Sequence, residues 1–299
     1  MSSAHYVGRF APSPTGALHA GSIVTALASW LDARAHQGRW LLRIEDIDPP
    51  REVAGAADQI ITTLRELGLH WDGEVSFQSR NTARYEAALA QLQASHKAYA
   101  CSCSRSQIAR FWQAQGLAHP KPGQEWPYPG ICRAGLAAGR PIRSWRLRVP
   151  AGVETFEDRR CGLQHEDVEQ AVGDFVLRRA DGFWAYQLAV VVDDAAQGVT
   201  DIVRGQDLLD STPRQRILQR ALGLPLPRTL HVGLVLGADG HKLSKQNGAI
   251  PINPGQPLRV LGDALHALGL PLPSEGRLQA WLAQATASWA AAHDLSRGA

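Results

Sequence analysis

The chain has 299 residues, of which 44% are hydrophobic and 20% charged, and its formal net charge is only +3. This apolar content supports the buried core of one large domain or two smaller ones, and a nucleic-acid partner would need locally clustered Lys and Arg. Four cysteines are too few for a disulfide scaffold, no apolar run could span a bilayer, and the N-terminus lacks the apolar core of a signal peptide, so we expect a cytoplasmic protein.

The first predicted elements are a strand that ends at Phe10 and a helix that follows the loop after it. Pro12 and Pro14 end the strand because proline has no backbone N–H to donate. The helix begins near Ser22, after which apolar residues recur on one face. The N–H groups at such a helix start favour phosphates, and His19 adds a donor there.

This junction, PSPTGALHAGS, resembles the HIGH signature of class I aminoacyl-tRNA synthetases, in the form used by glutamyl enzymes. The match falls at His19 and Gly21, while Ser22 stands where many relatives have a second histidine. The resemblance implies that all three residues bind ATP and that His19 is catalytic. Taken alone, the stretch is explained equally well by an ordinary helix N-cap at Ser22.

Next come a buried strand over 39–46 and helical patterns over 51–67 and 82–94. Alternating strands and helices predict an α/β fold with a parallel, Rossmann-like sheet and right-handed crossovers. Ligands of such sheets lie at the carboxyl ends of the strands. Arg9 and Glu45 both lie near strand ends and are therefore expected to face one pocket.

The second strand ends in RIEDIDPPR, which resembles the LRIEDTD segment of the same family. The resemblance implies that Glu45 receives the α-ammonium of the substrate and that Arg9 binds a substrate carboxylate, as their charges allow. The residues that follow Arg9 would complete this part of the glutamate site: Phe10, Ala11, Pro12 and Ser13. Without the resemblance, the charged residues of these two segments are better explained by a structural ion pair, either Arg9 with Glu45 or Arg43 with Asp46.

From Cys101 to about Asp167 the alternation stops and glycine and proline become dense, which indicates an insertion. Cys101 and Cys103 form one arm of a metal site and Cys132 the second. From donor chemistry alone, Cys161 would complete an all-cysteine zinc site.

Glutamyl-queuosine tRNA(Asp) synthetases carry C-x-C followed later by Y-x-x-x-C, with the tyrosine hydroxyl as a ligand. Here the second pattern is Tyr128-Pro-Gly-Ile-Cys132. The resemblance therefore implies one Zn²⁺ per chain, held by Cys101, Cys103, Tyr128 and Cys132. Cys161 remains the alternative ligand, and a degenerate site without metal is a further one.

Arginines are frequent in the same insertion. Trp145, Leu147 and Val149 alternate with Arg146 and Arg148, which predicts a strand with one basic face. Such a face suits an RNA partner, although a solvated strand face balanced by nearby acids explains it equally well.

The segment 174–215 returns to the α/β pattern. Asp181-Gly182 predicts a hairpin turn, followed by a helix over 186–196 and a strand over 199–204. Class I glutamyl and glutaminyl enzymes have nearly the same sequence in this segment. The resemblance implies that Tyr186 and Arg204 complete the amino-acid pocket and bind the side-chain carboxylate of the substrate, while we expect Asp207 to cap the next helix.

The sequence HKLSKQ resembles the KMSKS loop. The resemblance places Lys242, Ser244 and Lys245 at the ATP phosphates, with both lysines catalytic. Losing one positioned donor of this kind costs roughly 3–4 kcal/mol of transition-state stabilisation. Helices over 258–268 and 275–291 are expected after it.

We therefore expect a first catalytic half (1–100), a zinc-bearing insertion (101–167), a second half (168–240) and a segment with the KLSKQ loop and the C-terminal helices (241–299), with no anticodon-binding domain. The resemblance implies an enzyme that activates L-glutamate with ATP and Mg²⁺, without needing tRNA, and transfers it to queuosine in the anticodon loop of tRNA(Asp). We expect it to be a monomer. Alternatives are a truncated glutamyl-tRNA synthetase that charges tRNA(Glu), a non-catalytic tRNA-binding relative, and a small-molecule adenylyltransferase.

Overall fold

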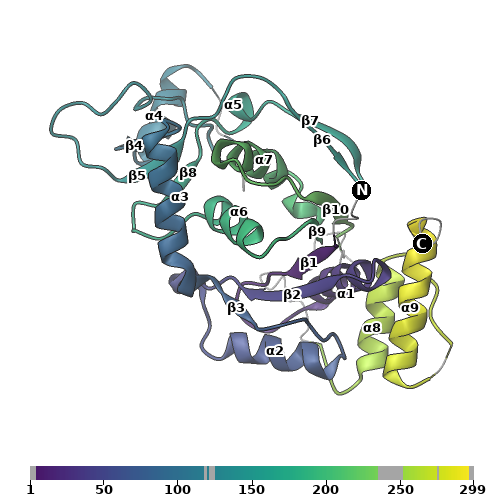
Figure 1. Cartoon of the computed structure of the whole chain (residues 1–299). Coiled ribbons are helices and arrows are strands. Elements are labelled where there is room, and N and C mark those ends of the chain that lie inside the picture. The colour runs from purple at the N-terminus through teal and green to yellow at the C-terminus, as the bar shows by residue number, and fades with distance from the viewer. Residues whose placement is uncertain (1–4, 118–119, 121–124, 235–251, 275, 296–299) are drawn as a thin grey trace.

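A computed structural model describes residues 5–117, 120, 125–234, 252–274 and 276–295. The fold is α/β with parallel strands, as predicted (Figure 1). Its helices are α1 (Ala20–Ala35), α2 (Ala56–Glu66), α3 (Thr82–Ala94), α4 (Arg105–Ala114), α5 (Val168–Ala171), α6 (Tyr186–Ala196), α7 (Ser211–Leu222), α8 (Pro257–Ala267) and α9 (Leu278–Ala292). Its strands are β1 (Val7–Phe10), β2 (Arg39–Ile44), β3 (Ser76–Phe77), β4 (Ala98–Cys101), β5 (Ser144–Leu147), β6 (Glu154–Asp158), β7 (Gly162–Glu166), β8 (Val176–Arg178), β9 (Asp201–Gly205) and β10 (Arg228–Val232).

The parallel strands of the fold form two groups. One group has the order β1-β2-β3, and the other places β10 between β6 and β9, with β7 antiparallel at the edge. The two groups meet where the Thr200 N–H donates to the Val7 carbonyl at 2.9 Å. Their carboxyl ends therefore lie along one edge, where the ligand of such a sheet is expected.

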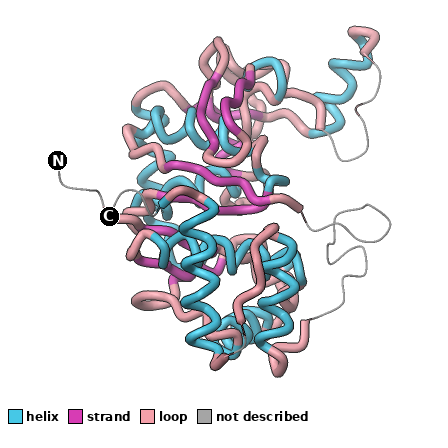
Figure 2. Tube along the Cα trace, turned by 90° about the vertical axis from the view of Figure 1, so that its right-hand side faces the viewer, coloured by secondary structure: helices cyan, strands magenta, loops and turns pink. Residues whose placement is uncertain are grey.

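The third sheet is antiparallel and has the order β4-β5-β8. It lies at the end of the molecule opposite α8 and α9, and α4 projects beside it (Figures 1 and 2). The hairpin predicted at Asp181-Gly182 follows β8, where Arg178 forms a bridge with Trp184.

The strands on either side of residue 167 are interleaved. β6, from the segment expected to be an insertion, pairs with β10 of the parallel group. β8, from the segment expected to be the second catalytic half, pairs with β5. The division of the chain at residues 101 and 167 therefore stays a prediction, and the strand pairing crosses it.

The main hydrophobic core lies between the parallel strands and the helices of both chain ends. α1 packs against α8 and α9, which contribute the buried Leu261, Leu265, Trp281 and Trp289. Figure 1 shows these two helices side by side next to α1. In the part of the chain that the structure describes, no helix has the length and apolar character needed to cross a membrane.

One buried carboxylate joins these parts. Asp32 of α1 is 0% exposed and accepts hydrogen bonds from Tyr6, Arg159 and Trp289 at 2.6 to 2.9 Å. These partners come from the residue before β1, the β6–β7 turn and α9. Burial would raise the pKa of Asp32, but the Arg159 guanidinium outweighs burial and holds the pKa below its ordinary value.

Candidate amino-acid and metal sites

A group of buried charges lies at the carboxyl ends of β1 and β2. Arg9 donates to Asp194 at 3.0 Å, and Arg43 contacts both Asp194 at 2.8 Å and Glu45 at 3.2 Å. Asp194 comes from the last turn of α6. The expected ion pairs, Arg9 with Glu45 and Arg43 with Asp46, are therefore wrong. Arg9 pairs with Asp194, and Arg43 pairs with Asp194 and Glu45.

The two acids of this group differ in protonation tendency. Burial raises the pKa of Glu45, and Arg43 and Arg9 oppose the rise only in part. Burial acts the same way on Asp194, but the two arginines outweigh it and lower its pKa. Of the two carboxylates, Glu45 is therefore the one whose charged form is less stabilised by the two arginines.

Arg204, at the end of β9, is 3% exposed. Its guanidinium donates to His231 Nε2 at 3.0 Å, Gln215 Oε1 at 2.8 Å and Thr212 Oγ1 at 2.8 Å. All three acceptors are neutral groups, and in the described part of the chain no carboxylate lies within 4.0 Å of this arginine. A buried guanidinium with only neutral partners is suited to an incoming anion.

Tyr186 begins α6 and lies within the electrostatic reach of the same group. Burial raises its pKa, and the charges of Arg204 and Arg9 act to lower it. The structure therefore brings Arg9, Glu45, Tyr186 and Arg204 together, as the sequence predicted. Phe10 differs, because its ring lies in the core and stacks on Trp40, so only its backbone can face a ligand.

The start of α1 differs from the expected N-cap. His19, not Ser22, is the capping residue, since His19 is extended and its Nδ1 accepts from the Ser22 N–H at 3.4 Å. The helix therefore begins at Ala20, inside HAGS rather than after it. Lys242, Ser244 and Lys245 lie outside the described residues.

Two aspartates that follow Glu45 have structural partners. Asp46 accepts from Ser79 N and Oγ, and Asp48 pairs with Arg51. Asp207 was expected to cap the helix that became α7. The cap position of α7 is Asp210, so that expectation is wrong.

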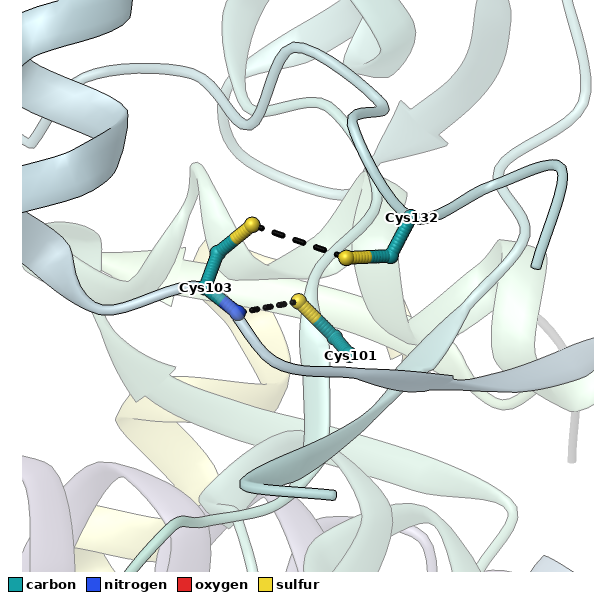
Figure 3. A group of neighbouring side chains, drawn as sticks. All are labelled: Cys101, Cys103 and Cys132. Atoms are coloured by element: carbon teal, nitrogen blue, oxygen red, sulfur yellow. Dashed lines mark hydrogen bonds between the residues drawn. The ribbon is translucent and has the colours of Figure 1, made fainter. Parts of the chain in front are cut away.

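Three buried cysteines converge in the insertion. The sulfurs of Cys101, Cys103 and Cys132 lie within 4.8 Å of one another, and Figure 3 shows them pointing toward a common centre. The hydroxyl of Tyr128 completes the group, at 3.4 Å from Cys101 Sγ and 3.8 Å from Cys103 Sγ. The four donors predicted from C-x-C and Y-x-x-x-C are therefore neighbours in the fold.

The spacing of these donors suits a zinc ion. A tetrahedral ion with Zn–S bonds of about 2.3 Å separates its thiolates by roughly 3.8 Å. Cys103 Sγ and Cys132 Sγ are 3.6 Å apart. Burial raises the pKa of the Cys103 thiol to about 12, so a cation is required to stabilise its thiolate form.

Cys161 does not join the group. It lies in the β6–β7 turn, where its sulfur is 3.9 Å from the His231 carbonyl. The all-cysteine alternative therefore has no support from the geometry.

The basic strand face predicted around Arg146 is wrong in part. β5 is the central strand of its sheet, and Arg146 is buried beside the cysteines rather than exposed. Its guanidinium donates to Cys101 Sγ at 3.3 Å and lies 3.8 Å above the Tyr128 ring. Arg148 is the exposed arginine of the pair.

Gly173 supports Tyr128 from behind. A Cβ at Gly173 would lie 2.2 Å from the Tyr128 carbonyl oxygen and 2.8 Å from its nitrogen, and φ is +72°. We expect Gly173→Ala to displace Tyr128, to lower the zinc content, and to cost about 2–3 kcal/mol of unfolding free energy. Zinc analysis and urea unfolding measure the two effects.

Gly182→Ala is the matched control for that substitution. Gly182 also has a positive φ, +88°, but nothing lies within 4 Å of an added Cβ. Gly182→Ala should lower the unfolding free energy only by the backbone strain, about 1–2 kcal/mol, and leave the zinc content unchanged. Equal zinc loss in both variants would contradict the role assigned to Gly173.

Sequence reasoning missed the residues that hold the site from other elements: Asp158, Asp193, Asp194, Thr212 and Gln215. Asp193 accepts from Gln78, Asn81 and Tyr85. The available signal was the pair Asp193-Asp194 at the end of the apolar run YQLAVVV, because buried acids require partners.

Comparison with known proteins gives consistent matches. The family profile described as tRNA synthetases class I (E and Q), catalytic domain, matches residues 6–257. A protein of Bordetella bronchiseptica named glutamyl-Q tRNA(Asp) synthetase is 58% identical over 96% of this chain and 89% of its own. Its namesake in Leptothrix cholodnii is 56% identical over 95% of this chain and 96% of its own.

Solved structures show the same fold. A glutamate tRNA ligase from Elizabethkingia meningosepticum, in complex with its amino acid, superposes with a TM-score of 0.79 at 24% identity, over 95% of this chain. A glutamate-tRNA synthetase from Elizabethkingia anophelis superposes with a TM-score of 0.71 at 27% identity, over 82% of this chain. This chain spans 64% and 53% of the length of those two chains.

Proposed function

Because the chain belongs to the class I tRNA synthetases (E and Q), and within them to the glutamyl-Q tRNA(Asp) synthetases, we propose that it activates L-glutamate with ATP and transfers the glutamyl group to queuosine in the anticodon loop of tRNA(Asp). It is a ligase-type enzyme. The observation that carries the proposal is Arg204, a buried guanidinium with neutral partners beside Tyr186 and Glu45.

Each end of glutamate has a complementary group in this site. Glu45 receives the α-ammonium, Arg9 binds a substrate carboxylate, and Arg204 with Tyr186 binds the side-chain carboxylate. The loop after β1 lines the site with Ala11, Pro12 and Ser13, and the Pro12 carbonyl is anchored by the Glu45 N–H at 3.0 Å. A carboxamide in place of the side-chain carboxylate would leave the charge of Arg204 unbalanced.

The activation step needs no protein nucleophile. The α-carboxylate of glutamate attacks the α-phosphorus of ATP in line, the bond to the β-phosphate oxygen breaks, and Mg²⁺-bound pyrophosphate leaves. His19 and the N-terminus of α1, with Gly21 and Ser22, lie where phosphates are favoured. Lys242, Ser244 and Lys245 are proposed to stabilise the charge on the leaving pyrophosphate.

In the second step a hydroxyl of the queuosine cyclopentene diol attacks the carbonyl carbon of glutamyl-adenylate. An ester forms, AMP leaves, and the hydroxyl proton passes to a base, for which the adenylate phosphate is available. We expect the enzyme to act as a monomer in the cytoplasm.

Zinc is proposed to be structural, with Cys101, Cys103, Tyr128 and Cys132 as its ligands. Removing one thiolate ligand should abolish stable zinc binding. We therefore expect Cys103→Ser to purify with less than about a tenth of the wild-type zinc, and Cys161→Ser to retain all of it. Metal analysis of both proteins tests the ligand set, and zinc loss in Cys161→Ser would contradict it.

Transfer of radiolabelled glutamate, with ATP, tests the proposed function on three purified RNAs. We expect label in queuosine-containing tRNA(Asp) and none in the same tRNA without queuosine or in tRNA(Glu). Label in tRNA(Glu) alone would instead establish a truncated glutamyl-tRNA synthetase.

A further inference from the structure

Two residues behind Arg204, His231 of β10 and Asp158 of β6, form a buried chain that ends on its guanidinium. We propose that they are positioning residues that hold Arg204 ready for a carboxylate and so set the preference for glutamate over glutamine. This proposal rests on the proposed function. It adds residues that touch no substrate and that no motif of the sequence marked.

Asp158 is the fixed end of the chain. Its Oδ1 accepts backbone N–H groups of Arg160, Cys161 and His231 at 2.9 to 3.2 Å, and its Oδ2 lies 2.6 Å from His231 Nδ1. Burial would raise the pKa of Asp158, but these hydrogen bonds, with that from His231 foremost, lower it well below its ordinary value. Asp158 is therefore an anion that can only accept.

These contacts determine the protonation of His231. Nδ1 faces an acceptor and must carry a proton, whereas Nε2 faces the Nε–H of Arg204 at 3.0 Å and must be free of one. His231 is 0% exposed, and its burial lowers the pKa of its ring. It is therefore a neutral imidazole in a single tautomer, donor on one side and acceptor on the other.

Within the described residues, the contacts of Arg204 leave two N–H groups of its guanidinium without a partner. His231 Nε2 and Thr212 Oγ1 are 3.3 Å apart, so both lie on the edge formed by Nε and Nη2. Gln215 takes one N–H of Nη1. A guanidinium has five N–H groups, so one N–H on each terminal nitrogen remains, enough for two hydrogen bonds to the two oxygens of a carboxylate.

A neutral acceptor matters as much as the geometry. Asp or Glu in place of His231 would orient Arg204 equally well but would neutralise its charge. The neutral imidazole orients the Arg204 guanidinium, and the positive charge of Arg204 stays available to the ligand. The carboxylate of glutamate then binds Arg204 more strongly than the carboxamide of glutamine does, which is the basis of the discrimination.

Three substitutions test the proposal in ATP–pyrophosphate exchange. Asp158→Asn replaces the carboxylate with an amide, whose N–H groups face His231 Nδ1. It therefore favours the opposite tautomer of His231, in which Nε2–H would face the N–H donor of Arg204. We expect the KM for glutamate to rise about 10- to 100-fold, with the KM for ATP unchanged and the preference over glutamine reduced. His231→Leu should behave in the same way, since it removes the acceptor.

His231→Gln is the conservative rescue, because its side-chain oxygen can accept from Arg204. Its KM for glutamate should stay within about fivefold of wild type. If Gln and Leu at this position impair glutamate and ATP alike, or if Asp158→Asn leaves the KM for glutamate unchanged, the positioning role is refuted.

Nitrogen NMR of the wild-type imidazole gives a readout that does not depend on activity. The His231 signals, identified by their loss in His231→Gln, should show protonated Nδ1 and unprotonated Nε2 at neutral pH. A protonated Nε2 would refute the proposal. A wild-type protein that exchanges no pyrophosphate with glutamate would instead refute the proposed function. The nitrogen signals would still show which nitrogen of His231 is protonated.

Discussion

Replacing Arg204 with alanine should lower kcat/KM for glutamate in ATP–pyrophosphate exchange by about a thousandfold, equivalent to about 4 kcal/mol. The substitution removes the cation proposed to bind the side-chain carboxylate and leaves the acceptors of Thr212, Gln215 and His231 without their donor. Truncating one partner of a buried charge pair costs that much because the remaining charge stays desolvated.

A lysine at this position separates charge from geometry. Arg204→Lys keeps the cation but loses the planar fork, so we expect an intermediate loss, about ten- to a hundredfold. Arg65→Ala, on the exposed face of α2, should leave the exchange unchanged. If Arg204→Ala retained kcat/KM within tenfold of wild type, Arg204 would not be the carboxylate-binding residue.

Replacing Asp32 with alanine should lower the unfolding free energy by about 4 kcal/mol, since it leaves the Arg159 guanidinium without its buried partner. The same change removes the acceptor of Tyr6 and Trp289. Urea unfolding at pH 7 measures the loss. Asp181→Ala, which breaks an exposed pair with Arg179, is the control and should cost no more than about 1 kcal/mol.

The dependence on pH gives a second check on Asp32. Its folded-state pKa lies below the ordinary value, so its contribution is present above the ordinary pKa and is lost as pH falls through the folded-state pKa. The stability gap between wild type and Asp32→Ala should therefore narrow in acid. A gap that stayed constant across this range would show that Asp32 does not act as a charge.

Local motifs predicted the parts of the fold and site that depend on neighbouring residues. The helices over 82–94 and 186–196 end where their patterns end. Arg9, Glu45, Tyr186 and Arg204 were found because each lies in a segment that resembles the family. Their roles remain proposals, and the kinetic variants of Arg204 test one of them.

The remaining contacts were not predictable because they join residues far apart in sequence. Asp158 and His231 are 73 positions apart, and Asp194 reaches Arg9 across 185. No local pattern marks such pairs. Arg146 shows a related limit: alternation predicts which residues share a strand face, but the exposure of that face depends on what packs against it, which here includes the cysteines and the Tyr128 ring.

The position of α9 has a consequence for the synthesis of the protein. Trp281, Leu282 and Trp289 of α9 pack in the same core as α1. These two helices are more than 240 residues apart along the chain. A ribosome adds about 5–20 residues per second, so the apolar face of α1 stays uncovered for roughly tens of seconds during translation. The nascent chain is therefore expected to need a holding chaperone until α9 has emerged.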